Sequence, residues 1–429
     1  MSNNYTKKIS LSEDIKNIKN NTTDIYNIIN KVCKNIEEAD PIVKAFENEV
    51  EDSKKIRLLN DAYYSSKNDE LHGVIVGVKD IFRVDGFPTK AGSSLPPELF
   101  EGQEASSVTK LKKAGALIAG KTVTTEFAYF EPGQTRNPVN INHTPGGSSS
   151  GSAAAVAAGF CHVALGTQTI GSISRPASFC GIIGYKPSYG RISTDGVIPF
   201  SPSADHVGFF TQDIEGIGII ANVLCDNWNK NIKTSKLPVL GVPDGNYMYR
   251  ADNTVLENFE FNIQKLQDKG FIIKRIKTFE NIEDINRIHK LMVSAEIAEV
   301  HKNWFKKHRK LYRFHTKEII EYGQKIDKSD VKKAIKGQLE LRKKLQNLMS
   351  KQKFDLWISP STLTEAPIGI ETTGNPFMNL PWTYSGLPTI TIPSEKTTNQ
   401  LPLGLQFTGF FNEDEKMLDF VGRIKGIEV

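Results

Sequence analysis

Two serine-bearing turns flank one short apolar segment and are the strongest sign of chemistry in this chain. The first is Thr144-Pro-Gly-Gly-Ser-Ser-Ser-Gly-Ser152, and the second is Leu165-Gly-Thr-Gln-Thr-Ile-Gly-Ser172. Glycine beside serine permits backbone angles that let several N–H groups converge on one point. A serine facing such N–H groups has the geometry that acyl transfer requires. The two turns are therefore predicted to be catalytic.

A flexible linker and a phosphate-binding loop are the alternatives for the first turn. Glycine and serine often form linkers, but here Ala153-Ala-Ala-Val-Ala-Ala158 follows at once and indicates a packed helix. The G-x-x-x-x-G-K-[ST] pattern of a phosphate loop, with its lysine, is missing. The sequence favours the catalytic interpretation over both.

A serine nucleophile needs a base, and histidine is the usual one. The chain has no G-x-S-x-G elbow that would anchor a Ser-His-Asp arrangement. His143 lies near the glycine loop, His162 lies in an apolar run, and His206 follows Asp205. We expect His143 and His162 to be structural and Asp205 to hold a turn.

Lysine is the other candidate base, and Lys79 fits the role best. It follows the β-branched run Val74–Val78, which predicts a buried strand. A lysine buried at a strand end without a carboxylate loses its charge, because desolvation disfavours the ammonium form. A salt bridge from Lys79 to Asp80 or Glu126 is an equal alternative on position and composition.

Helices and strands alternate along the chain. Residues 10–65 are predicted to be helical with an interruption at Asp40-Pro41. The strand Val74–Val78, the helix Ser106–Ala114 and the strand Ala116–Ala119 predict a parallel crossover unit. Ligand chemistry in such sheets gathers at the carboxyl ends of strands, where Lys79 falls.

The same alternation continues beyond residue 150 and favours one mixed sheet clothed in helices. We expect the C-terminal strands to form a hairpin and Asn412 to cap a last helix. The predicted helices are Ala153–Ala158, Thr211–Cys225, Val255–Leu266 and a long helical region over 282–352. The predicted strands are His162–Leu165, Val239–Val242, Phe271–Ile276, Phe354–Ser359, Leu387–Pro393 and Leu403–Thr408.

Composition describes an ordinary globular protein. Of the 429 residues, 39% are hydrophobic and 24% are charged, and the net charge of +5 is slight for this length. The four cysteines show no C-x-x-C spacing, so neither a zinc site nor a disulfide framework is indicated. The N-terminus lacks a secretory apolar segment, and Ala153–Leu165 is too short to span a bilayer. We expect a cytoplasmic protein.

With these residues in view, the chain resembles the amidase-signature family of serine hydrolases. The resemblance runs from about residue 20 to about residue 425 and is densest over 70–210. The matching segments are Gly77-Val-Lys-Asp80, Glu126-Phe-Ala128, Gly146-Gly-Ser-Ser-Ser-Gly-Ser-Ala153, Gly166-Thr-Gln-Thr-Ile-Gly-Ser172, Pro176-Ala-Ser-Phe-Cys-Gly181, Lys186-Pro187, Ser203-Ala-Asp-His-Val-Gly208, Asn379-Leu-Pro-Trp-Thr383 and Leu401-Pro-Leu-Gly-Leu-Gln406.

The resemblance implies an α/β fold of the amidase-signature type, a large mixed β-sheet covered on both faces by helices. We expect a single domain with a helical subregion. Residues 1–65 would be its N-terminal helical segment and residues 66–429 the amidase domain proper. Within the latter we expect a signature core at 70–210, a helical cover at about 282–352, and C-terminal strands and a helix at 354–429.

The resemblance also implies a Ser-cisSer-Lys triad. Ser172 would be the nucleophile, and Ser148, after a cis Gly147–Ser148 peptide, would relay its proton to a neutral Lys79. An acyl-enzyme on Ser172 would then be hydrolysed by water, without metal or cofactor. The further residues expected in the oxyanion hole or at the substrate are Phe127, Ala128, Gly147, Ser149, Thr169, Ile170, Gly171 and Trp382.

Three residues near the second turn depart from the family pattern. Ile170 stands where the family often has glycine or alanine, and it adds β-branched bulk beside the oxyanion hole. Gln168 stands where many members carry aspartate, and Ser174 stands where arginine or an apolar residue is commoner. All three triad positions are intact, so the resemblance implies an active enzyme.

Three functions remain open at this point. The first is a free-standing hydrolase of linear amides, favoured by the Gln-Thr-Ile-Gly-Ser turn and the loop Phe130–Pro138. The second is the glutaminase-type A subunit of a tRNA-dependent amidotransferase. The third is a non-catalytic RNA-binding protein built on the basic stretch 300–350, where several carboxylates dilute the charge and favour a solvated helical face. We expect a small-molecule amide as partner, neither nucleic acid nor membrane, and leave a homo-oligomer open.

Overall fold

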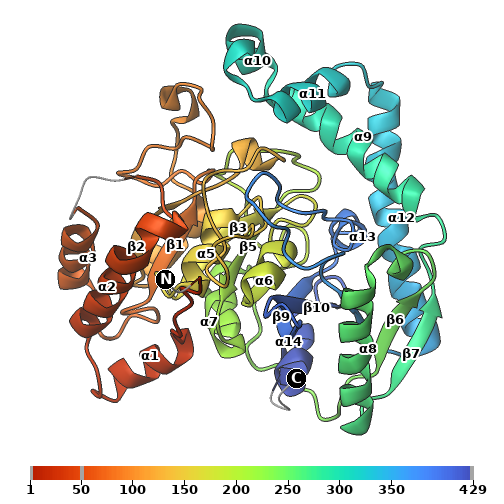
Figure 1. Ribbon diagram of the computed structural model, residues 1–429, viewed down its shortest axis with the longest axis horizontal. Coiled ribbons are helices and arrows are strands. Elements are labelled where there is room, and N and C mark those ends of the chain that lie inside the picture. The colour runs from red at the N-terminus through yellow and green to blue at the C-terminus, as the bar shows by residue number, and fades with distance from the viewer. Residues whose placement is uncertain (1–2, 49–52, 426–429) are drawn as a thin grey trace.

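A mixed β-sheet crosses the whole molecule in the computed structural model, which describes residues 3–48 and 53–425 (Figure 1). Within these residues the strand order is β2-β1-β3-β5-β4-β9-β10-β8-β6-β7. The strands are β1 (Ile75–Lys79), β2 (Leu117–Thr122), β3 (Val163–Gln168), β4 (Ile183–Lys186), β5 (His206–Thr211), β6 (Leu240–Asp244), β7 (Ile273–Lys277), β8 (Leu356–Pro360), β9 (Thr389–Lys396) and β10 (Pro402–Thr408).

The strand pairing is parallel at both ends of the sheet and antiparallel in its middle. Strand β1 pairs in parallel with β2 and β3, and β6 pairs in parallel with β7 and β8. The pairs β3–β5, β4–β5, β4–β9, β9–β10 and β8–β10 are antiparallel. The predicted mixed sheet and its C-terminal hairpin are confirmed.

Helices occupy most of the remaining chain. The α-helices are α1 (Leu11–Lys19), α2 (Ile25–Val43), α3 (Ser53–Tyr64), α4 (Ser106–Lys113), α5 (Ser150–Ala157), α6 (Ser174–Cys180), α7 (Ile214–Leu224), α8 (Asn253–Asp268), α9 (Ile282–Val300), α10 (Lys302–His308), α11 (Phe314–Gly323), α12 (Lys328–Gln352), α13 (Leu380–Tyr384) and α14 (Asp414–Lys425). The short 3-10 turns are η1 (Pro97–Phe100), η2 (Glu126–Ala128), η3 (Met248–Arg250) and η4 (Arg309–Leu311).

Both faces of the sheet are covered, because alternate residues of a strand point to opposite sides. In β1, Val76 and Val78 enter one hydrophobic core, while Ile75, which precedes Val76, enters another. The first core also takes side chains from α7, α9 and α14, and the second takes them from α2, α5 and α6. The predicted sheet with helices on both faces is confirmed.

The predicted crossover unit is present and brings Lys79 to a strand end. Strand β1, helix α4 and strand β2 follow one another, and the two strands pair in parallel with Lys79 opposite Thr122. Lys79 is the last residue of β1. The run of β-branched residues therefore located both the strand and its carboxyl end.

Some predicted boundaries were wrong. Pro41 lies inside α2, which ends at Val43 with Lys44 in a left-handed conformation, so Asp40-Pro41 does not interrupt the helix. A proline so close to a helix end disturbs few hydrogen bonds. Strands β4 and β5 were not predicted, and Thr211 ends β5 instead of starting the next helix, which begins at Ile214. Similarly, the last helix begins at Asp414, two residues after Asn412.

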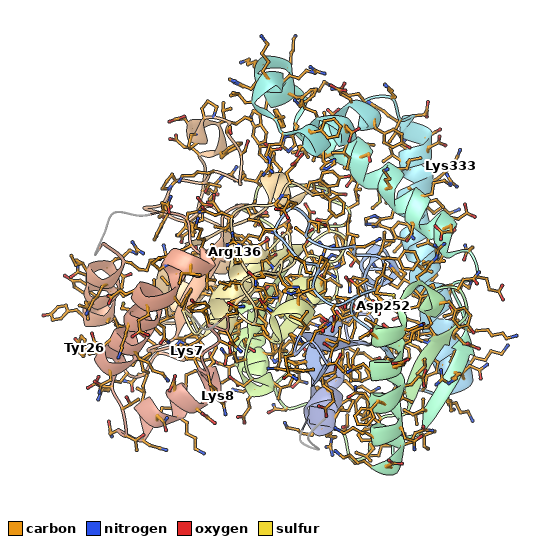
Figure 2. The ribbon with its side chains drawn as sticks, in the orientation of Figure 1. Lys7, Lys8, Tyr26, Arg136, Asp252 and Lys333 are labelled. Carbon is orange, nitrogen blue, oxygen red and sulfur yellow. The ribbon has the colours of Figure 1, made fainter. Side chains whose placement is uncertain are left out.

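The helical cover extends from α9 to α12 and projects beyond the sheet at α10 and α11 (Figure 1). Its outer face is charged and solvated, as expected from the sequence. Lys333 of α12, labelled in Figure 2, is exposed and pairs with Asp330, and Arg309 pairs with Glu321. Among the described residues, the helices are too short or too polar to cross a lipid bilayer.

Candidate active site

Lys79 is completely buried at the end of β1. Its Nζ atom lies 2.8 Å from Ser148 Oγ and 2.8 Å from Thr167 Oγ1. Burial lowers the pKa of Lys79 well below its usual value, because desolvation disfavours the ammonium form, and the negative charge of Asp205 opposes that shift. The Lys79 amine therefore lies between two hydroxyl groups, in a setting that favours its neutral form over the ammonium form.

The alternative of a salt bridge from Lys79 to Asp80 or Glu126 does not hold. Asp80 pairs with Lys121 at 2.6 Å, and Glu126 accepts the backbone N–H of Arg313 at 3.0 Å. Within the part of the chain that the structure describes, no salt bridge involves Lys79. Its amine is thus free of the carboxylate contact that keeps most buried lysines charged.

Ser148 lies on the glycine turn before α5, and the peptide bond Gly147–Ser148 is cis. The Arg175 guanidinium donates from Nη2 to the carbonyl oxygen of Gly147 at 2.6 Å. The Ser148 carbonyl accepts the Thr125 N–H at 3.2 Å. These contacts hold both sides of the peptide bond and fix Ser148 next to Lys79.

Ser172 follows β3 and precedes α6, and only 8% of it is exposed. Ser172 and Ser148 line the same small cavity of about 10 Å³, which has room for about one water molecule. The other lining residues are Ala128, Tyr129, Phe130, Thr169, Ile170, Arg175, Phe200 and Pro376. The structure therefore brings the three residues expected to form the triad to one place.

The backbone beside Ser172 carries free donors. Within residues 3–48 and 53–425, the N–H groups of Ile170, Gly171 and Ser172 have no protein acceptor. The next two N–H groups, those of Ile173 and Ser174, both donate to Gln168 Oε1, at 2.8 and 2.9 Å. Three consecutive free N–H groups beside a serine could stabilise the oxyanion of an acyl-transfer intermediate if that serine were the nucleophile.

A second cavity of about 70 Å³ adjoins the first, sharing Ala128, Thr169 and Phe200 with it. Asp205 is the carboxylate in its lining. That carboxylate accepts the Thr169 hydroxyl at 2.5 Å and the N–H groups of Phe200 and Ser201 at 2.8 and 2.9 Å. These contacts agree with the expected turn-holding role, and burial raises the pKa of Asp205 to about 6.

The other expected site residues divide into two groups. Ala128, Thr169 and Ile170 line the cavities, and the glycines 147 and 171 belong to the two turns. The structure does not bring Phe127 or Trp382 to either cavity. Phe127 packs against Phe100 and His301, and Trp382 donates from Nε1 to the Tyr247 hydroxyl at 2.9 Å in the core. Ser149 is buried and lies 3.3 Å from the Thr167 carbonyl.

Several residues at the site were not identified from the sequence. Thr167, which contacts Lys79, lies in the Gly-Thr-Gln-Thr segment and was noted only as part of that motif. Arg175 and Phe200 line the serine cavity without having been predicted there. For Arg175, the local sign in the sequence was a charged residue three positions after Ser172 in an otherwise weakly charged segment. Phe200 comes from a loop whose path the sequence does not reveal.

The histidines have structural contacts, as expected. His143 Nδ1 lies 2.7 Å from the Ala366 carbonyl, and His162 Nδ1 accepts the Ile75 N–H at 3.0 Å. In the described part of the chain, no group of three or more histidine, cysteine or carboxylate side chains is arranged to hold a metal. Lys79 is the base whose contact with a serine of the site the structure records.

Comparison with known proteins agrees with this geometry. The Amidase family model matches residues 27–418. The A subunit of the Glutamyl-tRNA(Gln) amidotransferase from Endomicrobium trichonymphae is 28% identical over 93% of this chain and 93% of its own length. The protein of the same name from Salinibacter ruber is 29% identical over 72% of this chain, and the match spans only 62% of that relative's length.

Solved structures share the fold. A crystal structure described as an amidase superimposes with a TM-score of 0.88, at 28% identity, covering 97% of this chain and 99% of the other. The A subunit of the Thermotoga maritima Glutamyl-tRNA(Gln) amidotransferase gives a TM-score of 0.76 at 25% identity, covering 96% of this chain and 93% of the other. By its sequence, its mixed sheet and its serine turns, this chain belongs to the amidase family of C–N hydrolases.

Proposed function

We propose that this protein hydrolyses a small linear carboxylic amide to the acid and ammonia or an amine, through an acyl-enzyme on Ser172. The observation that carries the proposal is the contact between Lys79 Nζ and Ser148 Oγ in a fully buried setting. A buried lysine with a lowered pKa and no carboxylate contact can act as a base well below the pH at which an exposed lysine would. Proteins of this family are amide hydrolases, and Lys79 gives this chain a base for that chemistry.

In the proposed reaction, the Ser172 oxygen attacks the amide carbonyl while its proton passes to Ser148 Oγ. Ser148 releases its own proton to the neutral Lys79 amine, whose N–H groups remain bonded to Thr167 Oγ1. The relay then runs backwards and protonates the departing nitrogen. Water enters and attacks the acyl-enzyme by the same relay, which releases the acid and restores Ser172.

The free N–H groups of Ile170, Gly171 and Ser172 would hold the oxyanion during both steps. In other hydrolases the loss of one such donor lowers kcat by about 10²–10³-fold. Side chains beside these donors would also select the acyl group. Ile170 lines the serine cavity, so its side chain limits the room beside the reacting carbonyl.

Aromatic rings form much of the wall around the serines and support a small planar or apolar acyl group. Tyr129 lies between Phe130 and Phe200, with ring centroids 4.8 and 5.5 Å away. The serine cavity and its neighbour measure about 10 and 70 Å³. Spaces of this size accept a substituent of a few heavy atoms without rearrangement, so we expect small amides to be better substrates than peptides.

The second candidate is the glutaminase-type A subunit of a tRNA-dependent amidotransferase. Relatives with that name support it, since one matches 93% of this chain. The free-standing enzyme is favoured by the TM-score of 0.88 with the amidase structure, against 0.76 with the Thermotoga protein. Both candidates use the same serine and lysine, and they differ in the partner that the protein requires.

The experiment that tests the proposal is an ammonia-release assay of a panel of small amides with the purified chain alone. We expect turnover without added protein or tRNA, and a loss of about 10²–10⁴-fold in kcat for Lys79→Ala, which removes the base. Unchanged turnover in Lys79→Ala would contradict the proposed mechanism. Hydrolysis confined to glutamine and stimulated by tRNA would instead favour the amidotransferase component.

A further inference from the structure

The three free N–H groups of Ile170, Gly171 and Ser172 are oriented by hydrogen bonds to the carbonyl oxygens of the same peptide groups. In a trans peptide, the carbonyl of one residue and the N–H of the next point in opposite directions. Whatever binds the carbonyls of Thr169, Ile170 and Gly171 therefore also sets the directions of the N–H groups of Ile170, Gly171 and Ser172. Each of these carbonyls has a donor in the structure.

The donors come from three different helices. His289 of α9 lies with Nε2 3.0 Å from the carbonyl oxygen of Thr169. Thr383 of α13 donates its hydroxyl to the Ile170 carbonyl at 2.6 Å. The backbone N–H of Arg175, in the first turn of α6, donates to the Gly171 carbonyl at 3.0 Å. Two of the three contacts thus depend on side chains far from the turn in the sequence.

The Thr383 hydroxyl is itself oriented by Gln168. Gln168 Nε2 donates to Thr383 Oγ1 at 2.9 Å, which leaves the hydroxyl hydrogen for a carbonyl. Two carbonyls lie within reach, that of Ile170 at 2.6 Å and that of Asn379, in the preceding helical turn, at 3.1 Å. The shorter contact is the one to the serine turn. An aspartate at position 168 could accept the N–H groups of α6 but could not donate to Thr383.

His289 can hold the Thr169 carbonyl only as a neutral imidazole protonated at Nε2 or as a cation. Its side chain is buried with 1% exposed, and burial lowers its pKa to about 4. Among the described residues, its Nδ1 atom has no hydrogen-bond partner, while Nε2 faces the carbonyl. The neutral Nε2–H tautomer is the form that satisfies this contact at neutral pH.

We propose that His289 and Thr383 are positioning residues that aim the Ile170 and Gly171 N–H groups at the oxyanion of the reaction. The inference rests on the proposed function. Neither side chain lines the cavity that holds the serines, so both act through the carbonyls of the turn. Because the oxyanion forms only during the reaction, their loss should lower kcat and leave KM nearly unchanged.

The test pairs each disruptive variant with a variant that keeps the donor. Thr383→Val removes the hydroxyl at nearly constant shape, and Thr383→Ser retains it. His289→Phe removes the donor, and His289→Gln retains one. Ser294→Ala serves as the matched control, since Ser294 also lies on α9 but donates to the Lys290 carbonyl in its own helix.

Steady-state kinetics are measured with the best amide of the panel, and inhibition with a boronic acid that carries the same acyl group. Thr383→Val and His289→Phe are expected to lower kcat by about 10–10²-fold, less than the loss of an oxyanion donor itself. KM should change by no more than about twofold, because the ground-state amide gains little from these donors. Affinity for the boronic acid, which forms a tetrahedral adduct, should fall in parallel with kcat/KM. The Thr383→Ser, His289→Gln and Ser294→Ala variants should stay close to the parent.

Gln168→Glu provides a second route if Thr383→Val fails to fold. It keeps the acceptor for the N–H groups of Ile173 and Ser174 but removes the donor to Thr383, so it should also lower kcat and boronic-acid affinity. Unchanged kcat and unchanged boronic-acid affinity in the folded variants would overturn the inference while the parent remains active. A rise in KM alone would also overturn it. A parent that neither hydrolyses amides nor binds boronic acids would contradict the proposed function first, and this inference with it.

Discussion

At the scale of single residues, the proposed chemistry depends on how the protein disfavours the charged form of Lys79. The side chain is fully buried, and among residues 3–48 and 53–425 its amine bonds only to the hydroxyl groups of Ser148 and Thr167. The nearby Asp205 accepts hydrogen bonds from other donors. Desolvation penalises the ammonium form, whereas a neutral amine can accept the serine proton. The same burial that destabilises a charged lysine therefore makes it a usable base.

This arrangement predicts a pH dependence with a definite sign. Because the proposed active form is the neutral amine and the pKa of Lys79 is well below 10.5, kcat/KM should be lost as pH falls through that lowered value. The activity should reach its plateau far below pH 10.5. Asp205, whose pKa is about 6, also titrates on the acidic side, and its negative charge raises the pKa of Lys79. The measurement is a pH profile of kcat/KM for the parent.

Lys79→Arg is the control for this profile, because arginine stays protonated at every accessible pH. We expect that variant to be inactive throughout. A rise in activity with a midpoint near 10.5 in the parent, or substantial activity in Lys79→Arg, would show that the amine does not work as a neutral base.

At the scale of elements, one carboxylate ties the N-terminal helices to the core. Asp213 caps α7 by accepting the Gly216 N–H at 2.6 Å. Its other oxygen accepts the Leu11 N–H at 2.9 Å, at the start of α1. A single side chain thus satisfies free donors at the beginnings of two helices that lie about 200 residues apart in the chain.

Asp213→Ala is expected to lower the free energy of unfolding by about 2–3 kcal/mol, since it removes a helix cap and a charged hydrogen bond to a second helix. Asp24→Ala is the comparison, because Asp24 caps only α2 through the Asn27 N–H, and about 1 kcal/mol is expected there. Urea denaturation monitored by circular dichroism gives both values. Equal losses in the two variants would mean that the contact with α1 contributes nothing.

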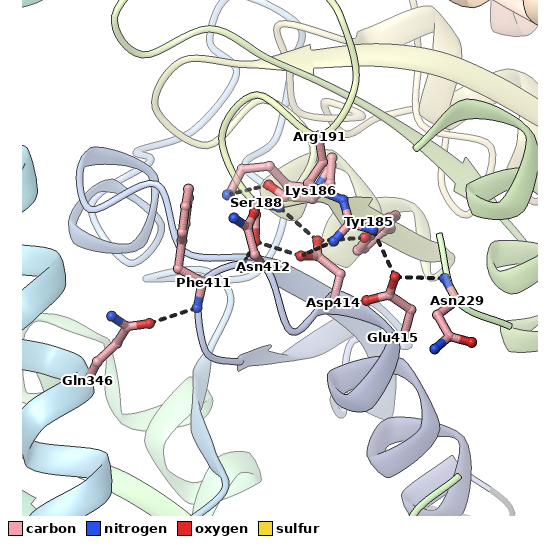
Figure 3. A network of polar contacts seen from close by, with 11 residues as sticks. Tyr185, Lys186, Ser188, Arg191, Asn229, Gln346, Phe411, Asn412, Asp414 and Glu415 are labelled. Carbon is pink, nitrogen blue, oxygen red and sulfur yellow. Dashed lines mark hydrogen bonds and ion pairs between the residues drawn. The ribbon is translucent and has the colours of Figure 1, made fainter. Parts of the chain in front are cut away.

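At the scale of the whole molecule, a buried polar network joins the C-terminal helix to the core (Figure 3). The Asp414 carboxylate accepts the Tyr185 hydroxyl at 2.8 Å and the Ser188 hydroxyl at 2.6 Å. Beside it, Arg191 pairs with Glu415 at 2.8 Å. Lys186 is fully buried and donates to the Leu387 carbonyl at 2.6 Å. These contacts hold the start of α14 against the residues at the end of β4.

Lys186 makes the stability of the fold depend on pH. Burial lowers its pKa to about 7, whereas an unfolded lysine keeps its proton up to about pH 10.4. Between these values the unfolded chain binds more protons, so the contribution of Lys186 to stability rises with pH. It is least favourable below about pH 7, where both states are protonated.

Lys186→Met removes this titration. The free energy of unfolding of the parent relative to Lys186→Met should therefore increase by about 1 kcal/mol per pH unit between pH 7 and pH 9. Urea denaturation of both proteins at pH 7, 8 and 9 measures the difference. A difference that stays constant over this range would show that Lys186 keeps its proton in the folded state.

Local patterns in the sequence were enough to place the strand and the turns that carry the proposed triad, but not their surroundings. The β-branched run before Lys79 and the serine turns are contiguous signals, so strand β1 and both turns could be placed from them. Strands β4 and β5 escaped prediction because they are short or carry a glycine, and their burial comes from neighbours on both sides. Pairing with neighbouring strands stabilises β4 and β5, and a short stretch of sequence does not reveal that pairing.

The contacts that orient the site could not be predicted, because they are made between distant segments. His289 reaches Thr169 across 120 residues, and Thr383 reaches Ile170 across 213. For Trp382 the prediction failed in a different way, because a core residue was assigned to the substrate site. Trp382 was expected at the substrate but is buried against Tyr247 in the core, because a large apolar ring is at least as useful for packing as for binding.

The identity of the nucleophile is the central claim, and covalent trapping tests it most directly. The parent protein and Ser172→Ala are treated with a fluorophosphonate, and the labelled peptide is identified by mass spectrometry. We predict one phosphonylated residue, Ser172, slower labelling in Lys79→Ala, and no labelling in Ser172→Ala. Labelling of Ser172→Ala as strong as that of the parent, or modification at another serine, would contradict this assignment.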